Sequence, residues 1–325
     1  MTSLDPRPLF TVVMPCLDEE AAVSRAVESL ADEYFVENGE MLVVDGGSTD
    51  RTPEIVRGLA EKYPIRLLHN PDKLQAYGLN IGIKEARGRY IVRADAHCLY
   101  PLGYIRRCVE MLERENVYNA GGVMQPVGES DKQKAIALAM RHPVGVGDAK
   151  FHLGKYTGFA EGAYVGAFKK EIFDLVGPYD PKANPNEDSE LNIRIVKSGR
   201  KIYLDGSLKV RYFPRSSFGR LFRQYFKYGR GRCYTTLKHR RFTSPRQLAP
   251  PLLVLALAAS IVIAPFWPFA LAFPAVYAAA ILLVSLFARS DEKIDYKVRI
   301  LMARAFATMH LAWGLGFISR LFGFR

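Results

Sequence analysis

The chain of 325 residues has only four cysteines, and no two of them form a C-x-x-C pair. Cys16, Cys98 and Cys108 fall in segments with strand or helix patterns. This usage predicts free thiols in a reducing compartment, and it argues against a cysteine-bound zinc site or a disulfide scaffold. The first residues carry Asp5 and two prolines and lack an apolar run, so we expect no signal peptide.

Two common phosphate-binding signatures are also missing. The sequence contains no GK[ST] ending of a P-loop and no GxGxxG dinucleotide fingerprint. What it does contain is the pair Gly46-Gly47 directly after an apolar run. Such a pair is flexible and allows a ligand to approach the backbone closely.

Acidic residues are absent from a long basic block. From Gly206 to Arg246 the chain has 12 Lys and Arg and no Asp or Glu, against a net charge of +12 for the whole chain. A block of this kind suits an anionic partner, which can be a nucleic acid, a membrane surface or a phosphorylated ligand.

Charge of either sign is absent from residues 249–288. These 40 residues are twice the ~20 that one membrane helix needs. We expect two membrane helices, about 250–266 and 268–288, that turn at Pro265-Phe266-Trp267-Pro268. A pair of buried core helices is the alternative. A third apolar segment, about 300–324, contains Arg304, His310 and Arg320, and the sequence does not decide whether it spans or lies in the interface.

Basic residues flank this hairpin on both sides, at 238–246 and in the charged loop 289–299. Both flanks of a two-pass hairpin lie on one face, and the positive-inside rule makes that face cytoplasmic. The sequence therefore predicts an inner (plasma) membrane location, with the rest of the chain on the cytoplasmic face.

The N-terminal part alternates short apolar runs with amphipathic stretches. Runs at 10–14, 41–44, 65–68 and 90–92 read as strands, and helical spacing follows near Ala22, near Pro53 and over 75–86. We expect Asp18–Glu20 to lie in the first turn of the first helix, and Ser48 or Thr49 to cap the second. Strands alternating with helices predict a doubly wound α/β sheet with parallel strands.

Polar side chains follow several of these expected strand ends. Asp18 and Glu19, then Asp45, and then Asp95 with His97 each come directly after a strand-like run. In open α/β sheets, ligands bind at the carboxyl ends of the strands. Carboxylates gathered on one rim repel one another unless a cation or hydrogen-bond donors lie among them.

Four segments together carry a family resemblance: VVMPCLDEE, VVDGGSTDRT, NPDKLQAYGLNIGIKEARGRYIVRADAH and NEDSELNIRIVKSGRKIYL. In this order they resemble inverting, nucleotide-sugar-dependent glycosyltransferases of family 2, most nearly the succinoglycan-biosynthesis glucosyltransferase type. The resemblance covers about 10–232 and implies a GT-A fold with a mixed sheet. We therefore expect a GT-A domain at 1–215, a basic amphipathic interface segment at 216–247 and a membrane region at 248–325.

The resemblance also implies roles for individual residues. The implied nucleotide-sugar contacts are Pro15, Asp18, Glu19, Asp45, Lys73 and Asp95. Lys73 could equally be an ordinary loop lysine; a capping role for Asp45 is the alternative, but Ser48 and Thr49 already offer caps, so the nucleotide role is favoured. The family's D-x-D motif reads Asp95-Ala96-His97 here, so Asp95 and His97 are the expected ligands of a divalent cation, Mn²⁺ or Mg²⁺. Asp188 is the expected catalytic base, with Glu187, Gly162 and Tyr164 on the acceptor side.

The basic block fits the same interpretation. Residues 224–228, QYFKY, loosely resemble the Q-x-x-R-W motif of processive polysaccharide synthases, but Lys227 and Tyr228 depart from it. The expected ligands of a lipid-linked diphosphate are Gln224, Lys227, Arg230 and Arg232.

The resulting hypothesis is a membrane-associated glycosyltransferase for polysaccharide biosynthesis. It transfers a sugar, glucose by resemblance, from a UDP-sugar to a saccharide carried on a polyprenyl diphosphate, with no nucleic-acid partner. Three alternatives remain from the sequence: a polyprenyl-phosphate glycosyltransferase, a non-catalytic nucleotide-sugar-binding membrane scaffold, and an RNA-binding protein.

Overall fold

The computed structural model describes residues 7–240, 242, 244–289 and 293–324. This described part does not include the chain start, residues 241 and 243 of the basic segment, or residues 290–292 of the charged loop. The expectations for these residues therefore lie outside it. The chain forms two compact units, one from Met1–Gln125 and Lys150–Tyr212 and the other from Pro126–Ala149 and Phe213–Arg325. The sequence did not indicate that 126–149 join the C-terminal helices.

A nine-stranded sheet in the order β3-β2-β1-β4-β8-β6-β9-β5, with β7 paired to β9, organises the first unit. Its strands are β1 (Phe10–Cys16), β2 (Gly39–Asp45), β3 (Ile65–His69), β4 (Tyr90–Arg93), β5 (Cys98–Leu99), β6 (Asn119–Pro126), β7 (Gly158–Ala160), β8 (Tyr164–Lys169) and β9 (Ile202–Tyr212). β1 to β4 are parallel, whereas β8 runs antiparallel to β4. The expected alternation and the mixed sheet are both confirmed.

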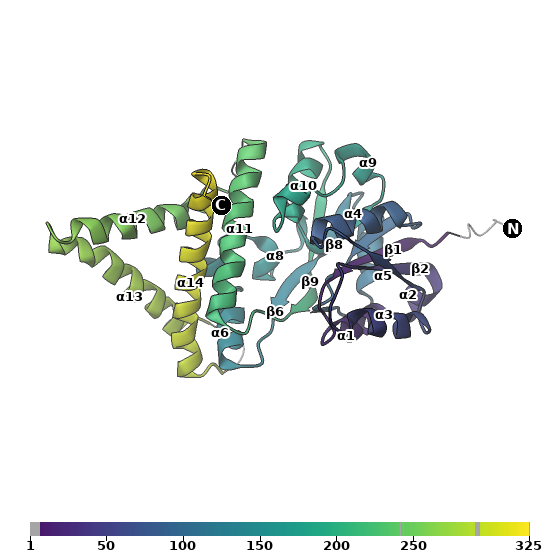
Figure 1. Cartoon of the computed structure of the whole chain (residues 1–325), viewed down its shortest axis with the longest axis horizontal. Helices are drawn as coiled ribbons and strands as arrows, with labels where there is room; N and C mark the ends of the chain where they lie inside the picture. Colours follow the sequence, from purple (N-terminus) through teal and green to yellow (C-terminus); the bar gives the residue numbers. More distant parts are fainter. Residues whose placement is uncertain (1–6, 241, 243, 290–292, 325) are drawn as a thin grey trace. The chain divides into compact units, whose positions relative to one another are not determined.

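Helices cover the strands because their apolar positions recur on one side. The first unit contains α1 (Val23–Leu30), α2 (Glu33–Asn38), α3 (Thr52–Ala60), α4 (Gln75–Glu85), α5 (Tyr104–Arg114), α8 (Lys150–Leu153), α9 (Ile172–Val176) and α10 (Glu187–Lys197). One core cluster joins Leu79 of α4, Phe173 of α9 and Leu191 of α10 to Val13 and Ile91 of the sheet. α4, α9 and α10 therefore pack over neighbouring strands (Figure 1).

Two expectations about helix starts are wrong. α1 begins only at Val23 and has no acidic residue in its first turn. α3 begins at Thr52 behind Arg51 and has no side-chain cap. Asp18–Glu20 and Ser48–Thr49 instead lie in the loops after β1 and β2, where they bind each other.

Gly88 lies just before β4, at a position that has no room for a side chain. A Cβ on Gly88 would lie 2.4 Å from the carbonyl carbon of Phe10, and the Gly88 N–H donates to Thr11 Oγ1 at 2.9 Å, which holds the backbone in place. We expect Gly88→Ala to destabilise the fold by about 1–3 kcal/mol, a typical cost of overpacking, read as a lower melting temperature. Gly58→Ala is the matched control, since Gly58 lies in α3 with nothing within 4 Å of its Cβ position, and it should stabilise by up to about 1 kcal/mol. Equal melting temperatures for both variants would contradict this.

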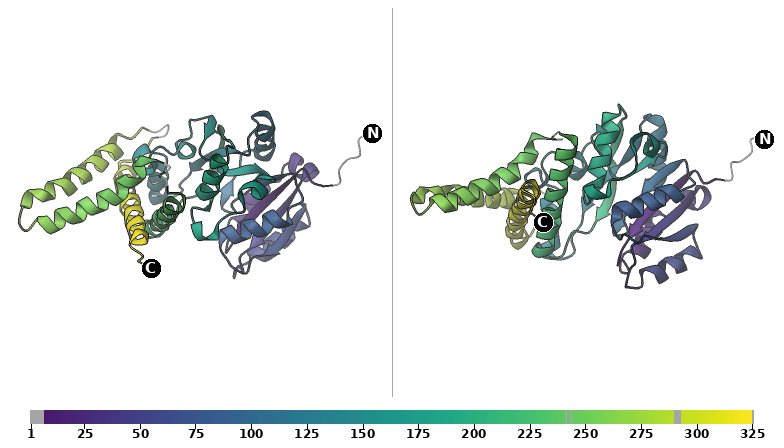
Figure 2. Two further views of the ribbon diagram at one scale, coloured as in Figure 1. Left: turned by 90° about the horizontal axis from the view of Figure 1, so that it is seen from above. Right: turned by 45° about the horizontal axis from the view of Figure 1, so that its top comes forward.

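The second unit is helical within the described residues. It contains α6 (Asp131–Ala139), α7 (Pro143–Val146), α11 (Phe218–His239), α12 (Ala249–Ile263), α13 (Ala272–Phe287) and α14 (Tyr296–Leu321). Three segments are long and apolar enough to cross a membrane: Pro245–Ile263, Pro268–Phe287 and Tyr296–Leu321. The first two form the expected hairpin, with the turn at Phe266 and Trp267 (Figure 2).

The third apolar segment differs from the hairpin in its packing. Half of its most apolar window is buried by protein, against 11% and 17% for the two hairpin segments. α14 lies directly on α11, because a Cβ on Gly229 would approach Trp313 O to 2.0 Å and one on Gly316 would approach Phe226 O to 2.1 Å. Glycines thus allow the two backbones to come into close contact.

Candidate active site

The loops after β1 and β2 bind each other at the carboxyl ends of their strands. β1 and β2 pair in register up to Cys16 and Asp45, so the loops leave the sheet side by side. Asp18 Oδ1 accepts from the Thr49 N–H at 2.8 Å, and the Glu19 N–H donates to Thr52 Oγ1 at 2.8 Å. The structure therefore brings the expected nucleotide contacts Pro15, Asp18 and Glu19 beside Asp45.

Asp45 shapes the turn that follows it. Its carboxylate accepts from the Gly47 N–H at 3.0 Å and from Ser48 Oγ at 2.5 Å. Gly47 has φ of +78°, which a side chain disfavours. Lys73 lies next to this turn, since its carbonyl oxygen is 3.4 Å from where a Cβ on Gly46 would be. Ser48 thus donates its hydroxyl hydrogen bond to Asp45 and does not cap α3.

Asp95 is buried just beyond β4 and is held at one oxygen. Its Oδ1 accepts from Gln75 Nε2 at 3.0 Å and from Arg93 Nε and Nη2 at 3.3 Å. Its backbone N–H donates to Tyr100 Oη at 2.7 Å. Within the described residues, no hydrogen bond or ion pair reaches Oδ2, so this oxygen is available to a ligand.

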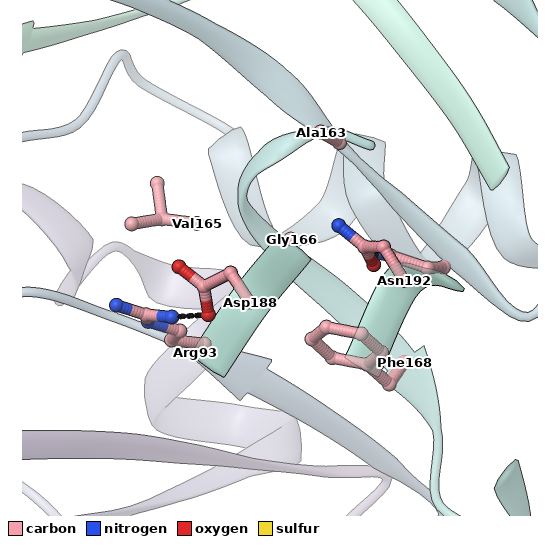
Figure 3. Close-up of a pocket in the computed structure, with 8 residues that line it drawn as sticks. Arg93, Ala163, Val165, Gly166, Phe168, Asp188 and Asn192 are labelled. Atoms are coloured by element: carbon pink, nitrogen blue, oxygen red, sulfur yellow. Dashed lines mark hydrogen bonds and ion pairs between the residues drawn. The ribbon is translucent and has the colours of Figure 1, made fainter. Parts of the chain in front are cut away.

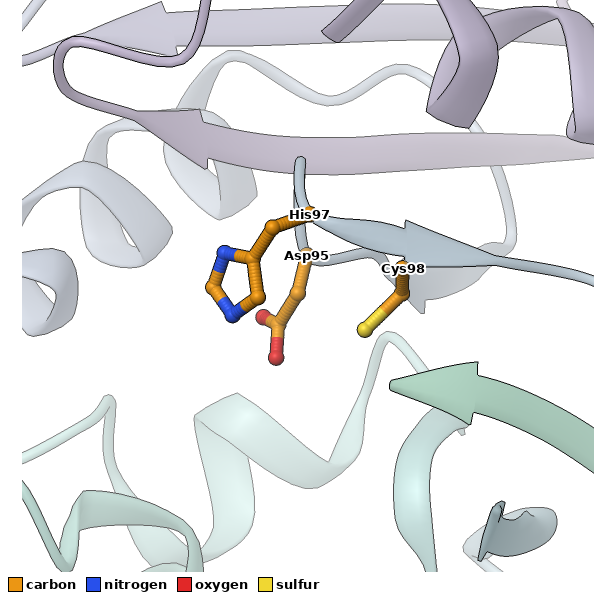
Figure 4. A group of neighbouring side chains, drawn as sticks. All are labelled: Asp95, His97 and Cys98. Carbon is orange, nitrogen blue, oxygen red and sulfur yellow. The ribbon is translucent and has the colours of Figure 1, made fainter. Parts of the chain in front are cut away.

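His97 and Cys98 lie next to Asp95 (Figure 4). One ligand atom from each of the three residues falls within 4.8 Å of the others. The Nδ1 atom of His97 is 3.0 Å from Glu19 Oε1, and metal-binding histidines commonly have a carboxylate on the ring nitrogen that does not bind the metal. Burial raises the pKa of Cys98 above its usual value, so its thiol is protonated as long as no metal is bound. The carboxylate and imidazole pair fits a divalent transition-metal cation.

Arg93 joins Asp95 to the first turn of α10. It ends β4, and its side chain is only 6% exposed. Its guanidinium lies 3.3 Å from Asp95 Oδ1 and 3.8 Å from Glu187 Oε1, and it forms an ion pair with Asp188 (Figure 3). Burial alone would lower the pKa of Arg93, but Asp95 and the other nearby groups raise it, so the guanidinium stays charged.

Glu187 and Asp188 begin α10, as the sequence predicts. The Glu187 side chain is 2% exposed; burial raises its pKa, and Arg93 opposes that rise. The Asp188 side chain is 49% exposed, so this carboxylate can meet a ligand from solvent. Asp95 and Asp188, expected on the two sides of the reaction, thus share one guanidinium.

The two remaining acceptor-side residues also lie near this network. Tyr164 begins β8, and its Oη is 3.2 Å from Cys98 Sγ. A Cβ on Gly162 would lie 2.9 Å from Asn192 Nδ2 of α10. Asn192 and Asp188 line a small cavity together with Arg93.

The four expected lipid-diphosphate ligands lie on α11, in the second unit. Gln224 Nε2 donates to Tyr228 Oη at 2.9 Å. Arg230 Nη1 donates to Ser319 Oγ at 3.1 Å and to Phe324 O at 2.7 Å. Lys227 is exposed and Arg232 half-buried. These positions describe the second unit alone.

Sequence reasoning missed Arg93 altogether. The signal was present, since YIVRADAH places an arginine inside a run that is otherwise apolar up to Asp95. A buried arginine requires partners, and Glu187 and Asp188 are about ninety residues further along the chain. Sequence reasoning assigned Glu19 to the nucleotide and did not foresee that its carboxylate also contacts His97.

The mixed sheet with carboxylates at its strand ends defines a GT-A fold, and comparisons with known proteins agree. The chain is similar over 98% of its length to the mannosyltransferase PcManGT of Pyrobaculum calidifontis, solved with GDP-Man and Mn²⁺ (TM-score 0.62, 21% identity, 88% of that chain). It is also similar to residues 1–349 of S. aureus TarS with UDP-GlcNAc, over 97% of this chain and 92% of that one (TM-score 0.52, 13% identity).

Sequence comparison identifies the family. Residues 11–176 match the model of glycosyl transferase family 2. The chain is 36% identical over 317 residues to the succinoglycan biosynthesis protein ExoA of Rhizobium meliloti (strain 1021), covering 97% of this chain and 95% of that protein. The chain therefore belongs to glycosyl transferase family 2, as its motifs indicated.

Proposed function

We propose that this protein is an inverting glycosyltransferase that transfers a sugar from a UDP-sugar to a lipid-linked saccharide during polysaccharide biosynthesis. The observation that carries the proposal is that Asp95 and Asp188 both form ion pairs with the guanidinium of Arg93. One hexose can therefore contact a donor-side and an acceptor-side carboxylate at once. The relative named for succinoglycan biosynthesis supports the polysaccharide context, with glucose as the first donor to test.

The nucleotide binds along the loops after β1 and β2. Asp45 lies 7% exposed at the end of β2, Asp18 is held by Thr49, and Lys73 offers an exposed cation beside the turn. These residues, with Pro15, form the pocket for the base and ribose.

Asp95 and His97 are the residues that would hold a divalent cation beside the sugar diphosphate. A Mn²⁺ or Mg²⁺ ion bound there would offset the negative charge of the departing diphosphate. Glu19 fixes the ring of His97 from the far side, and Gln75 and Arg93 fix Asp95. The complex of PcManGT with Mn²⁺ supports a metal in this fold.

Asp188 removes the proton from the acceptor hydroxyl. The hydroxyl oxygen bonds to the anomeric carbon while the bond from that carbon to the diphosphate oxygen breaks. The proton passes to the Asp188 carboxylate, and the nucleoside diphosphate leaves with the bonding electrons. Attack opposite the leaving group inverts the anomeric centre, so an α-linked donor yields a β-linked product.

The hairpin of α12 and α13 anchors the enzyme in the inner membrane, with the GT-A unit on the cytoplasmic face. Its apolar side chains are exposed along both helices, and Phe266 in the turn between them is 90% exposed. Gln224, Lys227, Arg230 and Arg232 of α11 are the proposed contacts to the acceptor's diphosphate. Release of the full-length protein from membranes by salt or alkali, without detergent, would contradict the anchor.

Glu19→Gln tests the metal site without turnover. The amide removes the negative charge that orients His97, and loss of such an outer carboxylate typically costs about 10- to 100-fold in metal affinity. Mn²⁺ titration in the presence of UDP, read by electron paramagnetic resonance, should show that loss. Glu20→Gln is the matched control, because Glu20 binds Arg51 instead. Unchanged Mn²⁺ affinity in Glu19→Gln would remove His97 from the ligand set.

A donor screen tests the function as a whole. The full-length protein in detergent is incubated with radiolabelled UDP-glucose, UDP-galactose, UDP-N-acetylglucosamine or GDP-mannose, with Mn²⁺ or Mg²⁺ and a membrane lipid extract. We expect label from one UDP-sugar in the organic phase, and none after chelation. Nucleotide-sugar binding with neither transfer nor hydrolysis would identify a scaffold instead.

A further inference from the structure

Arg93 is a buried cation whose partners belong to two different parts of the active site. Asp95 follows β4, the strand that Arg93 ends, whereas Glu187 and Asp188 start α10. All three carboxylates contact the one guanidinium. A buried ion is costly unless it is well paired, so the charged state of Arg93 depends on all three carboxylates.

The geometry of the guanidinium explains how one side chain can serve three carboxylates. Nε and Nη2 face Asp95, Nη2 also faces Glu187, and Nη1 faces Asp188. A planar fork with five N–H donors can make these contacts at once, whereas a lysine ammonium offers a single point of charge. The three carboxylates outnumber the one cation, so each contact affects the others.

The three carboxylate partners of Arg93 differ in burial, and this difference suits them to different roles. Glu187 is enclosed and acts as a fixed support, because its side chain is 2% exposed. Asp188 is half open to solvent, at 49%, and within the described residues its side chain forms an ion pair with Arg93 alone. Asp95 contacts Arg93 and Gln75 only through Oδ1.

We propose that Arg93 is a positioning residue that aims the Asp188 carboxylate at the acceptor and couples it to the donor end of the site through Asp95. This inference rests on the proposed function. Arg93 holds Asp188 where it can take the acceptor proton, and it shares Asp95 with the donor's cation. A change at Asp188 therefore alters nucleotide binding only through Arg93.

A double-mutant cycle of Arg93→Lys and Asp188→Asn tests the turnover part. Displacing a reacting group by about 1 Å can cost on the order of 100-fold, so Arg93→Lys should lower kcat by about that factor and change the donor KM by less than about threefold. In the Asp188→Asn background the same change should cost less than about threefold, because residues that act as a unit are not additive. Multiplying effects would show that Arg93 acts independently of Asp188.

A binding cycle on the same four proteins tests the coupling without turnover. Calorimetry of UDP with Mn²⁺ should show that Asp188→Asn weakens binding by about three- to tenfold, since couplings between neighbouring charges are of this order. In the Arg93→Lys background, Asp188→Asn should have no measurable effect on binding. An equal effect in both backgrounds would overturn the proposal even if no transfer activity were found.

Two controls keep the outcome interpretable. Arg107→Lys alters a guanidinium–carboxylate pair with the buried Asp205 outside the site, and it should change neither kcat nor UDP affinity. If Arg93→Lys does not fold, the pair Arg93→Gln with Glu187→Gln removes one buried charge of each sign and carries the same expectations. Failure of the proposed function is seen separately, as absence of transfer by the unmodified protein.

Discussion

Replacing Asp95 with alanine is expected to abolish sugar transfer, with kcat/KM reduced by about 1000-fold or more. Asp95 supplies the carboxylate of the proposed cation site, and metal stabilisation of a leaving group contributes several kcal/mol. Each ~1.4 kcal/mol lost from the transition state is a tenfold loss of rate. The measurement is label transferred to the organic phase under saturating Mn²⁺.

Binding measurements separate this effect from misfolding. Asp95→Ala should lose the Mn²⁺-dependent part of UDP affinity while keeping the metal-independent part, because Asp45 and Lys73 are untouched. Its matched control is Asp174→Ala, an exposed position on α9, which should behave as the unmodified protein. If Asp95→Ala still showed full Mn²⁺-dependent UDP binding, the cation would lie elsewhere.

The sequence predicted what is local in this molecule. Apolar periodicity predicted which segments are strands and which are helices. The length of the uncharged run 249–288 predicted the helical hairpin. The positions of Asp45, Asp95 and Asp188 at the ends of elements follow from the same patterns. In each case the deciding signal lies within about twenty residues of the feature.

What the sequence did not predict depends on contacts between distant residues. Asp18 and Ser48 looked like first-turn and capping residues because those are their usual local roles. They bind across two loops only because β1 and β2 pair in register. The triple contact of Arg93 and the seating of α14 on α11 likewise join segments far apart along the chain, and no single stretch encodes them.

Asp188→Asn is the second change with a large expected effect, and it also distinguishes two kinds of acceptor. An amide of the same shape cannot accept the acceptor's proton, and loss of a general base costs about 100- to 10,000-fold. We expect kcat to fall by about 1000-fold, while UDP affinity in Mn²⁺ falls by no more than the three- to tenfold coupling through Arg93. Asp174→Asn, on an exposed turn of α9, is the matched control.

The result decides between a hydroxyl and a phosphate as the attacking group. A sugar hydroxyl must lose its proton to attack, and Asp188, in the first turn of α10, is a solvent-accessible carboxylate that can take it. A polyprenyl phosphate is already ionised at neutral pH, so a transferase that uses it as acceptor needs no base. Near-normal turnover of Asp188→Asn would therefore reject the saccharide acceptor and favour the lipid phosphate. A loss of kcat of about 1000-fold, with UDP affinity lowered by no more than about tenfold, identifies a hydroxyl. Because Arg93 holds Asp188 from the donor side, that loss should appear in kcat at saturating donor.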